Sequence, residues 1–320
     1  MSRHSRDLAR WLLAFAALVA LGCGPDFEPV QRLTKLRVLA LRNEPVNPHA
    51  GETTTYDALV FLPPGKPDAP TYAWSWCPLV GEANAGYTCP LTDAAVQEAS
   101  AALGVSGVPP LALGVSPTQT FTNPFPAAVL QNLCATGIDG TPVDCAGGFP
   151  VRVSLTVTQE GEQRAATTIL RLPLADDAPS NANPTFDPGE TPLVAALAGG
   201  DVPIANPPVA SLPRTVETKV RANLSDAAVE SYAGVDDEGA PTSARETLLL
   251  DWYIDAGDVS VFQTGYIPGQ TQLSELVENR WKPSSKASYA ADQAELIVVL
   301  RDNRGGVAWA SGAVILEPTP

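Results

Sequence analysis

The stretch Leu248-Leu249-Leu250-Asp251-Trp252-Tyr253-Ile254 decides the fold of this chain. Successive side chains of an extended strand point to opposite faces, so one face of this stretch carries Leu248, Leu250, Trp252 and Ile254. Four large apolar side chains on one face require an apolar surface opposite them. The stretch therefore predicts a middle strand of a β-sheet, with its tryptophan directed into a core.

The residues on either side of this strand add further strands. Apolar and polar side chains alternate over residues 216–224, and an apolar run at residues 296–300 leads into the turn Asp302-Asn303-Arg304-Gly305-Gly306. Glycine supplies the backbone angles that a tight β-connection needs. Residues 307–316 then complete a closing hairpin.

The first half of the chain carries the same signals in the same order. Residues 36–41 and 53–62 are the opening strands, and Tyr72, Trp74 and Trp76 alternate along a third strand. Residues 151–157 alternate again, and a Glu160-Gly161 turn connects them to residues 166–172. The chain therefore contains two related β-units, each with an inward tryptophan on a middle strand and a hairpin at its end.

This pattern resembles the immunoglobulin-like β-sandwich, in a divergent PKD-like form, because the second half lacks the cysteine pair of antibody domains. The resemblance implies an all-β protein of two tandem immunoglobulin-like sandwiches, at residues 33–175 and 191–320. Residues 176–190, which have no apolar periodicity, are the expected linker. The length of 320 residues suits two domains, and the 31 prolines favour loop-rich β-structure.

The first half is longer than the second because of an expected insert at residues 78–148. Two short helices are expected in it, at Asp93–Leu103, with Val96, Ala99 and Leu103 inward, and at Pro126–Cys134. Long loops on a rigid scaffold are where binding residues concentrate, so the insert is the first place to look for a partner. The alternative is a polar loop that its disulfides merely hold in place.

Four cysteines lie at the start of the insert and within it, and an even number in an exported chain indicates two disulfides. We favour the near-neighbour pairs Cys77–Cys89 and Cys134–Cys145. Pairings that connect the two loops remain open. No CxxC motif is present, so the thiols are not expected to bind metal.

The N-terminus resembles the lipobox of bacterial lipoproteins. Arg3, Arg6 and Arg10 precede an apolar run that ends in Ala20-Leu21-Gly22-Cys23. The run is about half of the ~20 residues that span a bilayer, which favours a cleaved signal peptide over a permanent anchor. The resemblance implies a signal peptide at residues 1–22, a diacylglycerol on Cys23 and a tether at residues 23–32. Gly24 favours transfer to the outer membrane. The alternative is an ordinary cleaved signal that leaves Cys23 unmodified.

Charge and residue usage exclude several functions. Without residues 1–22 the chain keeps 17 basic and 34 acidic residues, a surface that repels nucleic acid. His49 is then the one histidine, and it lies in an expected surface turn, so neither a catalytic triad nor a zinc site is expected. Nucleotide-binding motifs are missing, and no cofactor is expected. The carboxylates Asp251 and Asp255 could form a glycosidase pair, but a solvated strand face is the simpler interpretation.

Two weaker possibilities remain open. The acidic loop Asp236-Asp237-Glu238, with the segment from Asp255 to Asp258, could bind calcium, although no EF-hand spacing is present. Trp281 lies in a loop-like setting that could expose its ring to a sugar, whereas Trp74, Trp76 and Trp252 are expected in the cores.

Together these observations predict a lipid-anchored, non-enzymatic protein of the outer membrane that presents a protein- or glycan-binding surface. Its expected partners are the membrane, through the N-terminus, and an envelope protein or glycan. One alternative is a carbohydrate-active module, either a glycan-binding domain or a hydrolase with only carboxylates. Another is an architectural spacer or assembly accessory.

Overall fold

A computed structural model describes residues 29–79, 88–138, 141–214, 216–235, 241–283 and 292–317. The expected signal peptide at residues 1–22 and Cys23 lie outside the described residues, and so does the acidic loop Asp236-Asp237-Glu238. None of the helices in the described ranges has the length and apolar character of a membrane-spanning segment.

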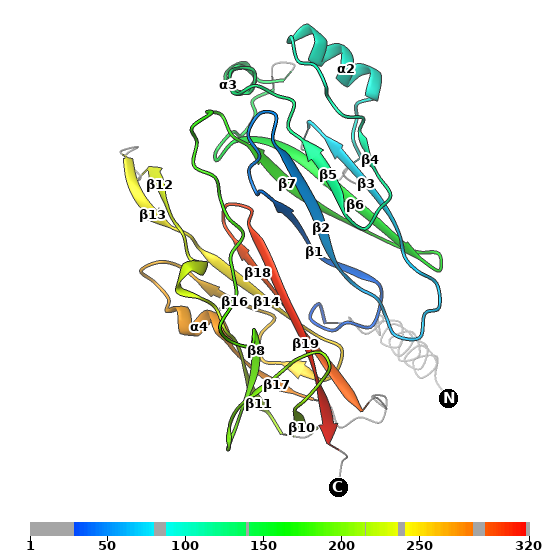
Figure 1. Cartoon of the computed structure of the whole chain (residues 1–320), viewed down its shortest axis with the longest axis vertical. Coiled ribbons are helices and arrows are strands. Elements are labelled where there is room, and N and C mark those ends of the chain that lie inside the picture. The colour runs from blue at the N-terminus through cyan, green and yellow to red at the C-terminus, as the bar shows by residue number, and fades with distance from the viewer. Residues whose placement is uncertain are drawn as a thin grey trace, which may run out of the picture.

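The first sandwich consists of two facing sheets (Figure 1). One sheet contains, in hydrogen-bonded order, β1 (Arg37–Glu44), β2 (Thr53–Phe61) and β5 (Gln119–Thr122). The other contains β4 (Ala112–Gly114), β3 (Thr71–Cys77), β6 (Phe149–Gln159) and β7 (Glu162–Leu172). The expected middle strand is therefore β3, which lies between β4 and β6.

Trp74 and Trp76 of β3 are buried in the core of the first sandwich, as their alternation predicts. The ring of Trp74 packs against Tyr56 at a centroid distance of 5.8 Å, and Trp76 packs against Phe121 at 5.2 Å. The indole N–H groups donate to the main-chain carbonyls of Ser116 and Pro110. Both tryptophans thus bury large apolar areas without leaving a polar atom unsatisfied.

The expected insert contributes to the sandwich as well as projecting from it. Its strands β4 and β5 pair with β3 and β2, so each sheet takes one edge strand from residues 112–122. Its helices are α2 (Asp93–Ala102) and α3 (Ala127–Thr136), close to the expected ranges. The boundary of the insert at residues 78–148 therefore includes two strands that the sequence pattern did not reveal.

The inward face of α2 differs from the expectation. Val96 is buried with Ser100, whereas Ala99 and Leu103 are exposed. The Thr92 hydroxyl accepts from Ala95 N–H and caps the helix. The buried residues of α2 are thus a single i, i+4 pair, which is too short a pattern for its direction to be read from sequence.

The second sandwich also has two facing sheets. One contains β10 (Ser211–Pro213), β19 (Val307–Glu317), β18 (Gln293–Asp302), β14 (Leu248–Ile254) and β16 (Gln263–Tyr266). The other contains β15 (Asp258–Val259), β17 (Glu278–Lys282), β11 (Thr218–Ala222), β8 (Leu193–Leu197) and β9 (Gly200–Pro203). The hairpin of β12 (Ser231–Val235) and β13 (Pro241–Arg245) projects from the connection between β11 and β14, and η2 (Asp226–Ala228) and α4 (Leu273–Val277) complete the described elements.

The strand order identifies both units as immunoglobulin-like sandwiches. In each, the strand with the buried tryptophan lies beside the first strand of the closing hairpin, as β3 beside β6 and β14 beside β18. The early strands β2 and β11 lie in the opposite sheet. In the second unit β10 pairs in parallel with the last strand, β19, while β8 pairs with β11 in the other sheet. The first strands of the second unit are thus divided between its two sheets, which the immunoglobulin-like architecture allows.

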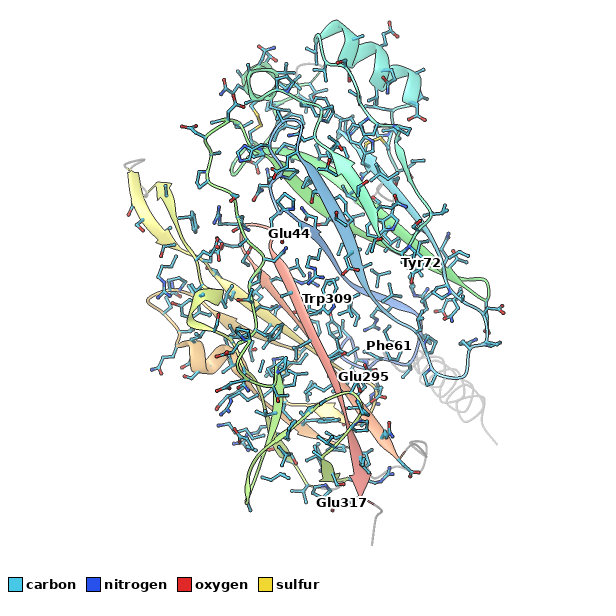
Figure 2. The ribbon with its side chains drawn as sticks, in the orientation of Figure 1. Glu44, Phe61, Tyr72, Glu295, Trp309 and Glu317 are labelled. Atoms are coloured by element: carbon cyan, nitrogen blue, oxygen red, sulfur yellow. A yellow bond between two sulfur atoms is a disulfide. The ribbon has the colours of Figure 1, made fainter. Side chains whose placement is uncertain are left out.

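A separate apolar cluster, here called the interdomain core, joins the two sandwiches. Its buried members are Leu33, Leu39, Ala40, Phe61, Tyr253, Ile297, Val299 and Val307, with Leu59, Phe262 and Trp309 partly buried against them. The first sandwich supplies the outer faces of β1 and β2, and the second supplies those of β14, β18 and β19. Figure 2 shows Phe61 and Trp309 between the two units.

Polar contacts close the rim of the interdomain core. The Arg42 guanidinium lies 4.2 Å from the centroid of the Trp309 ring, and Arg301 Nη2 donates to the Leu39 carbonyl at 2.7 Å. The Asp251 carboxylate accepts from Arg301 Nε at 3.2 Å and from Gln263 Nε2 at 2.6 Å. Asp251 is therefore not on a solvated strand face, because the first sandwich covers the outer face of β14.

The two segments that flank the first sandwich are also fixed in place. Before β1, Leu33 N–H donates to the Ile254 carbonyl, and Gln31 accepts from Ile254 N–H. In the expected linker, the Asn183 amide nitrogen donates to Asn43 in the first sandwich, and its oxygen accepts from Val307 N–H in the second. The middle of the expected linker, at residues 181–184, is therefore held against both sandwiches, whereas most residues at its two ends are exposed.

The interdomain core gives a direct stability prediction at Phe61. Replacing this buried ring with alanine (Phe61→Ala) should lower the free energy of unfolding by about 3 kcal/mol, because the apolar contact and the space it fills are lost together. Urea denaturation of residues 29–320 measures the change. The control is Leu62→Ala, since Leu62 is the neighbouring residue and is exposed. Equal effects of the two substitutions would contradict the assigned role of Phe61.

Candidate binding groove

A groove of about 830 Å³ lies where the end of the first sandwich meets the hairpin of the second. Besides Asn47, its walls come from four segments that are distant in sequence. These are the Cys145–Gly148 loop, the end of β7 with the chain that follows it, the β12–β13 hairpin and the turn between β18 and β19. The relative position of the two sandwiches therefore determines the shape of the groove.

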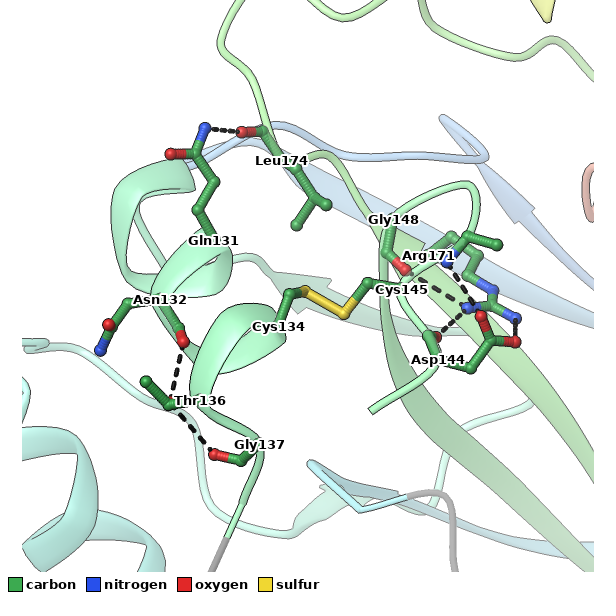
Figure 3. The surroundings of a disulfide bond; sticks show 11 residues. Gln131, Asn132, Cys134, Thr136, Gly137, Asp144, Cys145, Gly148, Arg171 and Leu174 are labelled. Atoms are coloured by element: carbon green, nitrogen blue, oxygen red, sulfur yellow. Dashed lines mark hydrogen bonds and ion pairs between the residues drawn. A yellow bond between two sulfur atoms is a disulfide. The ribbon is translucent and has the colours of Figure 1, made fainter. Parts of the chain in front are cut away.

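The Cys134–Cys145 disulfide holds the first wall (Figure 3). It connects the end of α3 to the loop that leads into β6. Arg171 of β7 donates through Nη1 to the carbonyls of Asp144 at 2.8 Å and Gly148 at 3.3 Å. Two main-chain carbonyls and one disulfide thus fix this loop against β7, which positions the wall before any ligand binds.

The second wall is centred on Arg304, in the turn between β18 and β19. Its guanidinium lies 4.8 Å from the centroid of the Tyr232 ring of β12. Arg304 Nη1 is 3.3 Å from Glu246 Oε1 and 3.5 Å from Glu230 Oε2. The turn itself is fixed by Asp302, whose Oδ1 accepts from the N–H groups of Arg304 and Gly306. Arg304 therefore holds the hairpin to the body of the second sandwich.

Glu246, behind Arg304, is a buried carboxylate. Burial raises its pKa, and the neighbouring carboxylates of Asp302 and Glu230 raise it further. The Glu230 N–H group and the Arg304 guanidinium act in the opposite direction. The relative exposure of the Glu246 side chain is only 1%. Because Glu246 sits under the hairpin rather than in the groove, we assign it a structural role.

Both disulfides have the near-neighbour pairing that the sequence favours. Cys77 is bonded to Cys89, and Cys134 to Cys145. Cys145 lines the groove, which places the C-terminal end of the expected insert in the candidate site. The other three disulfide cysteines are outside it.

The structure overturns the expectation for Trp281. Its ring is fully buried on β17, and its indole N–H donates to the Ala256 carbonyl at 2.9 Å. Proline at position 283 suggested a loop, but Arg280, Trp281 and Lys282 alternate as in a half-buried strand, and β17 pairs with both β11 and β15. Trp281 is therefore a core residue and offers no surface to a sugar.

The carboxylates singled out from the sequence do not meet in the groove. Asp251 is bound by Arg301 in the interdomain core. Asp255 lies beyond the end of β14, where its Oδ1 accepts from Glu295 N–H at 2.7 Å. Burial raises the pKa of Asp255, and burial together with the charge of Asp255 raises the pKa of Glu295. The groove contains neither Asp251 nor Asp255.

His49 and the calcium candidates also lie apart from the groove. His49 is in a turn, where its main-chain N–H donates to Glu52 Oε2. In the second calcium segment, Asp258 pairs with Arg32 at 2.6 Å, and Asp255 accepts from Glu295 N–H. Within the described ranges, no three histidine, cysteine or acidic side chains form a group that could hold a metal ion.

Sequence reasoning missed most of the groove. Asn47, Arg171, Tyr232 and Arg304 come from four separate loops and strand ends, and no local pattern connects them. The sequence predicts a β-connection at residues 302–306, and the arginine in this turn is the one local signal that points to the groove. A cationic side chain at the tip of a tight turn in an acidic chain is a candidate for binding.

Comparisons with known proteins find only distant likenesses. The chain matches no protein-family model and no curated protein sequence. A chimeric titin Z1Z2 tandem is 11% identical and aligns over 88% of this chain and all of that one, with a TM-score of 0.28. Murine CEACAM1b is 12% identical, over 88% of this chain and all of that one, with a TM-score of 0.22. Three N-terminal domains of the bacteriophage RB49 Hoc protein are 10% identical, and the match covers 89% of this chain and 59% of that one, with a TM-score of 0.20. The assignment to the immunoglobulin-like class therefore rests on strand order.

The raised pKa of Asp255 predicts an unusual pH dependence. When the pKa of a carboxyl is higher in the folded than in the unfolded state, the protein loses stability as the pH rises from the unfolded-state pKa to the folded-state pKa. Asp255→Asn keeps an oxygen acceptor for Glu295 N–H and removes the buried charge, so the variant should melt at a higher temperature than the wild type at pH 7.5. The difference should shrink toward pH 4.

Thermal melts of both proteins from pH 4 to pH 8 provide this measurement. Glu98→Gln, an exposed position on α2, is the matched control and should leave the profile unchanged. A constant difference between Asp255→Asn and the wild type at every pH would contradict the assigned burial of the charge.

Proposed function

We propose that this chain is a lipid-anchored, non-enzymatic protein of the outer membrane that holds the interdomain groove open to a protein or glycan of the cell envelope. The observation that carries the proposal is the groove itself, built jointly by two sandwiches that an apolar core holds in a fixed orientation. Interfaces between domains are frequent positions for binding sites.

Several features support an extracytoplasmic location. Two disulfides are typical of proteins that fold outside the reducing cytoplasm. The N-terminal sequence resembles a lipobox at Cys23, and only five residues separate Cys23 from Pro29, the first described residue. This short connection reaches at most about 20 Å, so the described chain would begin close to the lipid surface.

The arrangement of the elements suits this orientation. The chain enters beside Ile254, at the opposite end of the interdomain core from the β12–β13 hairpin (Figure 1). A molecule anchored at Cys23 would thus direct the groove away from the membrane. The same geometry disfavours a plain spacer, because a spacer does not require a groove between two fixed walls.

The chemistry of the groove favours binding over catalysis. Its charged lining residues are Arg171 and Arg304, and a guanidinium ion has donors but no acceptor with which to act as a general base. The carboxylate-only hydrolase has no support in the position of Asp251, because that side chain is bound by Arg301 and Gln263.

The lipid anchor is tested by Cys23→Ser. The wild type should incorporate radiolabelled palmitate and fractionate with the outer membrane, whereas the variant should incorporate none and move to the soluble fraction, because two or three acyl chains provide essentially all of the membrane affinity. Cys134→Ser with Cys145→Ser, which removes a disulfide and leaves Cys23 in place, is the control for cysteine substitution elsewhere in the chain. Unchanged fractionation of Cys23→Ser would refute the anchor.

The binding role is tested by a photo-crosslinking amino acid placed at Ala233, an exposed position in the groove. Irradiation of intact cells should give a discrete adduct of higher mass. The same amino acid at Val115, which is 76% exposed and outside the groove, should give none. Adducts from Val115 but not from Ala233 would place the binding surface elsewhere, and no adduct from either would favour the spacer.

A further inference from the structure

The hydrogen-bonding groups of the groove are not equally free. Asn47 Nδ2 donates to the Arg171 carbonyl at 2.9 Å. Asn303 accepts from Thr247 N–H and faces the Tyr232 hydroxyl at 3.3 Å. Side-chain amides of this kind read the hydroxyl groups of sugars, but here both are already engaged within the protein.

The free groups belong to the guanidinium ions and to the main chain. Arg304 contacts its two carboxylates through Nη1 alone, at 3.3 and 3.5 Å, longer than the ~2.8 Å of a strong charged hydrogen bond. Arg171 contacts the Asp144 carboxylate at 3.8 Å, and that carboxylate is largely exposed. Both arginines thus retain donors for an incoming anion.

The main chain of β7 provides a second set of free groups. β7 is an edge strand of its sheet, and no described strand pairs with its outer side. It follows β6 through the two-residue turn Glu160-Gly161, so every second residue from Gln163 onward directs its N–H and C=O away from β6. Arg171 agrees with this alternation, since its carbonyl accepts from Asn47, and Ile169 presents its main chain in the same direction.

Small residues line much of the two walls. Ala146, Gly147 and Gly148 are on the first wall, and Ala233 and Ala244 are on the second. Side chains of this size allow another main chain to approach closely. The groove thus combines a strand edge that is unpaired at Ile169, walls that admit a backbone and positive charge as the only charge among its lining residues.

From these observations we infer that the groove binds an extended, acidic polypeptide segment of a protein partner, with its main chain along β7 and its carboxylates on Arg171 and Arg304. The inference rests on the proposed binding function and names the ligand class. Charge complementarity selects the occupant, because the charged residues that line the groove are two arginines, and both keep donors beside their carboxylate partners. Strand addition is an established mode of peptide recognition.

An oligosaccharide fits the same groove less well. Carbohydrate sites need an aromatic ring with an open face, and Arg304 already covers one face of Tyr232. The amides that would read hydroxyl groups are engaged, and a sugar cannot pair with the strand edge. A sugar that carries a carboxylate, such as a uronic acid, would be bound only through the two arginines.

The test is to pan a phage-displayed library of random 12-residue peptides against immobilised residues 29–320. The sequences enriched on the wild type should be rich in aspartate and glutamate, and a synthetic peptide of the most enriched sequence should bind with measurable fluorescence anisotropy. Ala244→Trp fills the groove from the hairpin side and should weaken the peptide at least tenfold. Arg304→Gln should weaken it similarly and should reduce its dependence on salt.

The matched control is Arg280→Gln, which removes an arginine 69% exposed in its side chain and paired with Glu217 outside the groove. It should leave peptide affinity within twofold of the wild type. Because Arg304 also packs on Tyr232, circular dichroism melts of each variant must show an intact fold, and Ala244→Trp decides the result if Arg304→Gln unfolds. Absence of enrichment, enrichment of basic sequences, or equal affinity for wild type and Ala244→Trp would overturn the inference.

Oligoglucuronate of six sugar units is the parallel probe for a glycan. Binding of this probe that is lost in Ala244→Trp, without any peptide enrichment, would keep the groove as a binding site and reject the peptide. Failure of both probes, together with no crosslink from Ala233 in cells, would instead reject the proposed binding function.

Discussion

The fixed orientation of the two sandwiches depends on apolar contact between the outer faces of β1 and β2 and those of β14, β18 and β19. Eight buried apolar side chains form this interdomain core. Burial of that many side chains contributes on the order of 10 kcal/mol before the entropy of ordering is subtracted. Neighbouring domains joined by small polar contacts move relative to one another, whereas a large apolar interface prevents this. The pair therefore behaves as one body, and the groove keeps its width.

Polar groups at the rim make this interface specific. Asp251, Arg301 and Gln263 form a chain of contacts that ends on the Leu39 carbonyl of the other sandwich, so a shift of one strand would leave a buried charge without its partner. Losing one partner of a buried ion pair costs several kcal/mol. The apolar contact thus supplies the attraction, and the charges select the register in which the two sandwiches meet.

The strands and their tryptophans could be predicted from sequence because alternation is a local property. Trp74, Trp76 and Trp252 all point inward, and the Glu160-Gly161 turn lies where expected. Alternation does not show which strand faces the other sandwich covers, since Asp251 and Tyr253 alternate with apolar residues as they would on a solvated face. One signal was present: residues 296–300 are continuously apolar, which is typical of a strand covered on both sides. Trp281 was misjudged because Pro283 suggested a loop, although its neighbours alternate.

The groove was beyond local reasoning because its parts meet only when both sandwiches are assembled. Arg171 and Arg304 are separated by the linker and most of the second sandwich, and each is positioned by its own turn or loop. This origin has a thermodynamic consequence. The two walls belong to different sandwiches, so a ligand that contacts both of them binds one relative orientation of the sandwiches. Binding and the interdomain core are therefore coupled: the ligand stabilises the core by the same free energy that the core adds to ligand binding. A residue such as Val299, buried in the interdomain core and absent from the groove lining, thereby influences affinity without contacting the ligand.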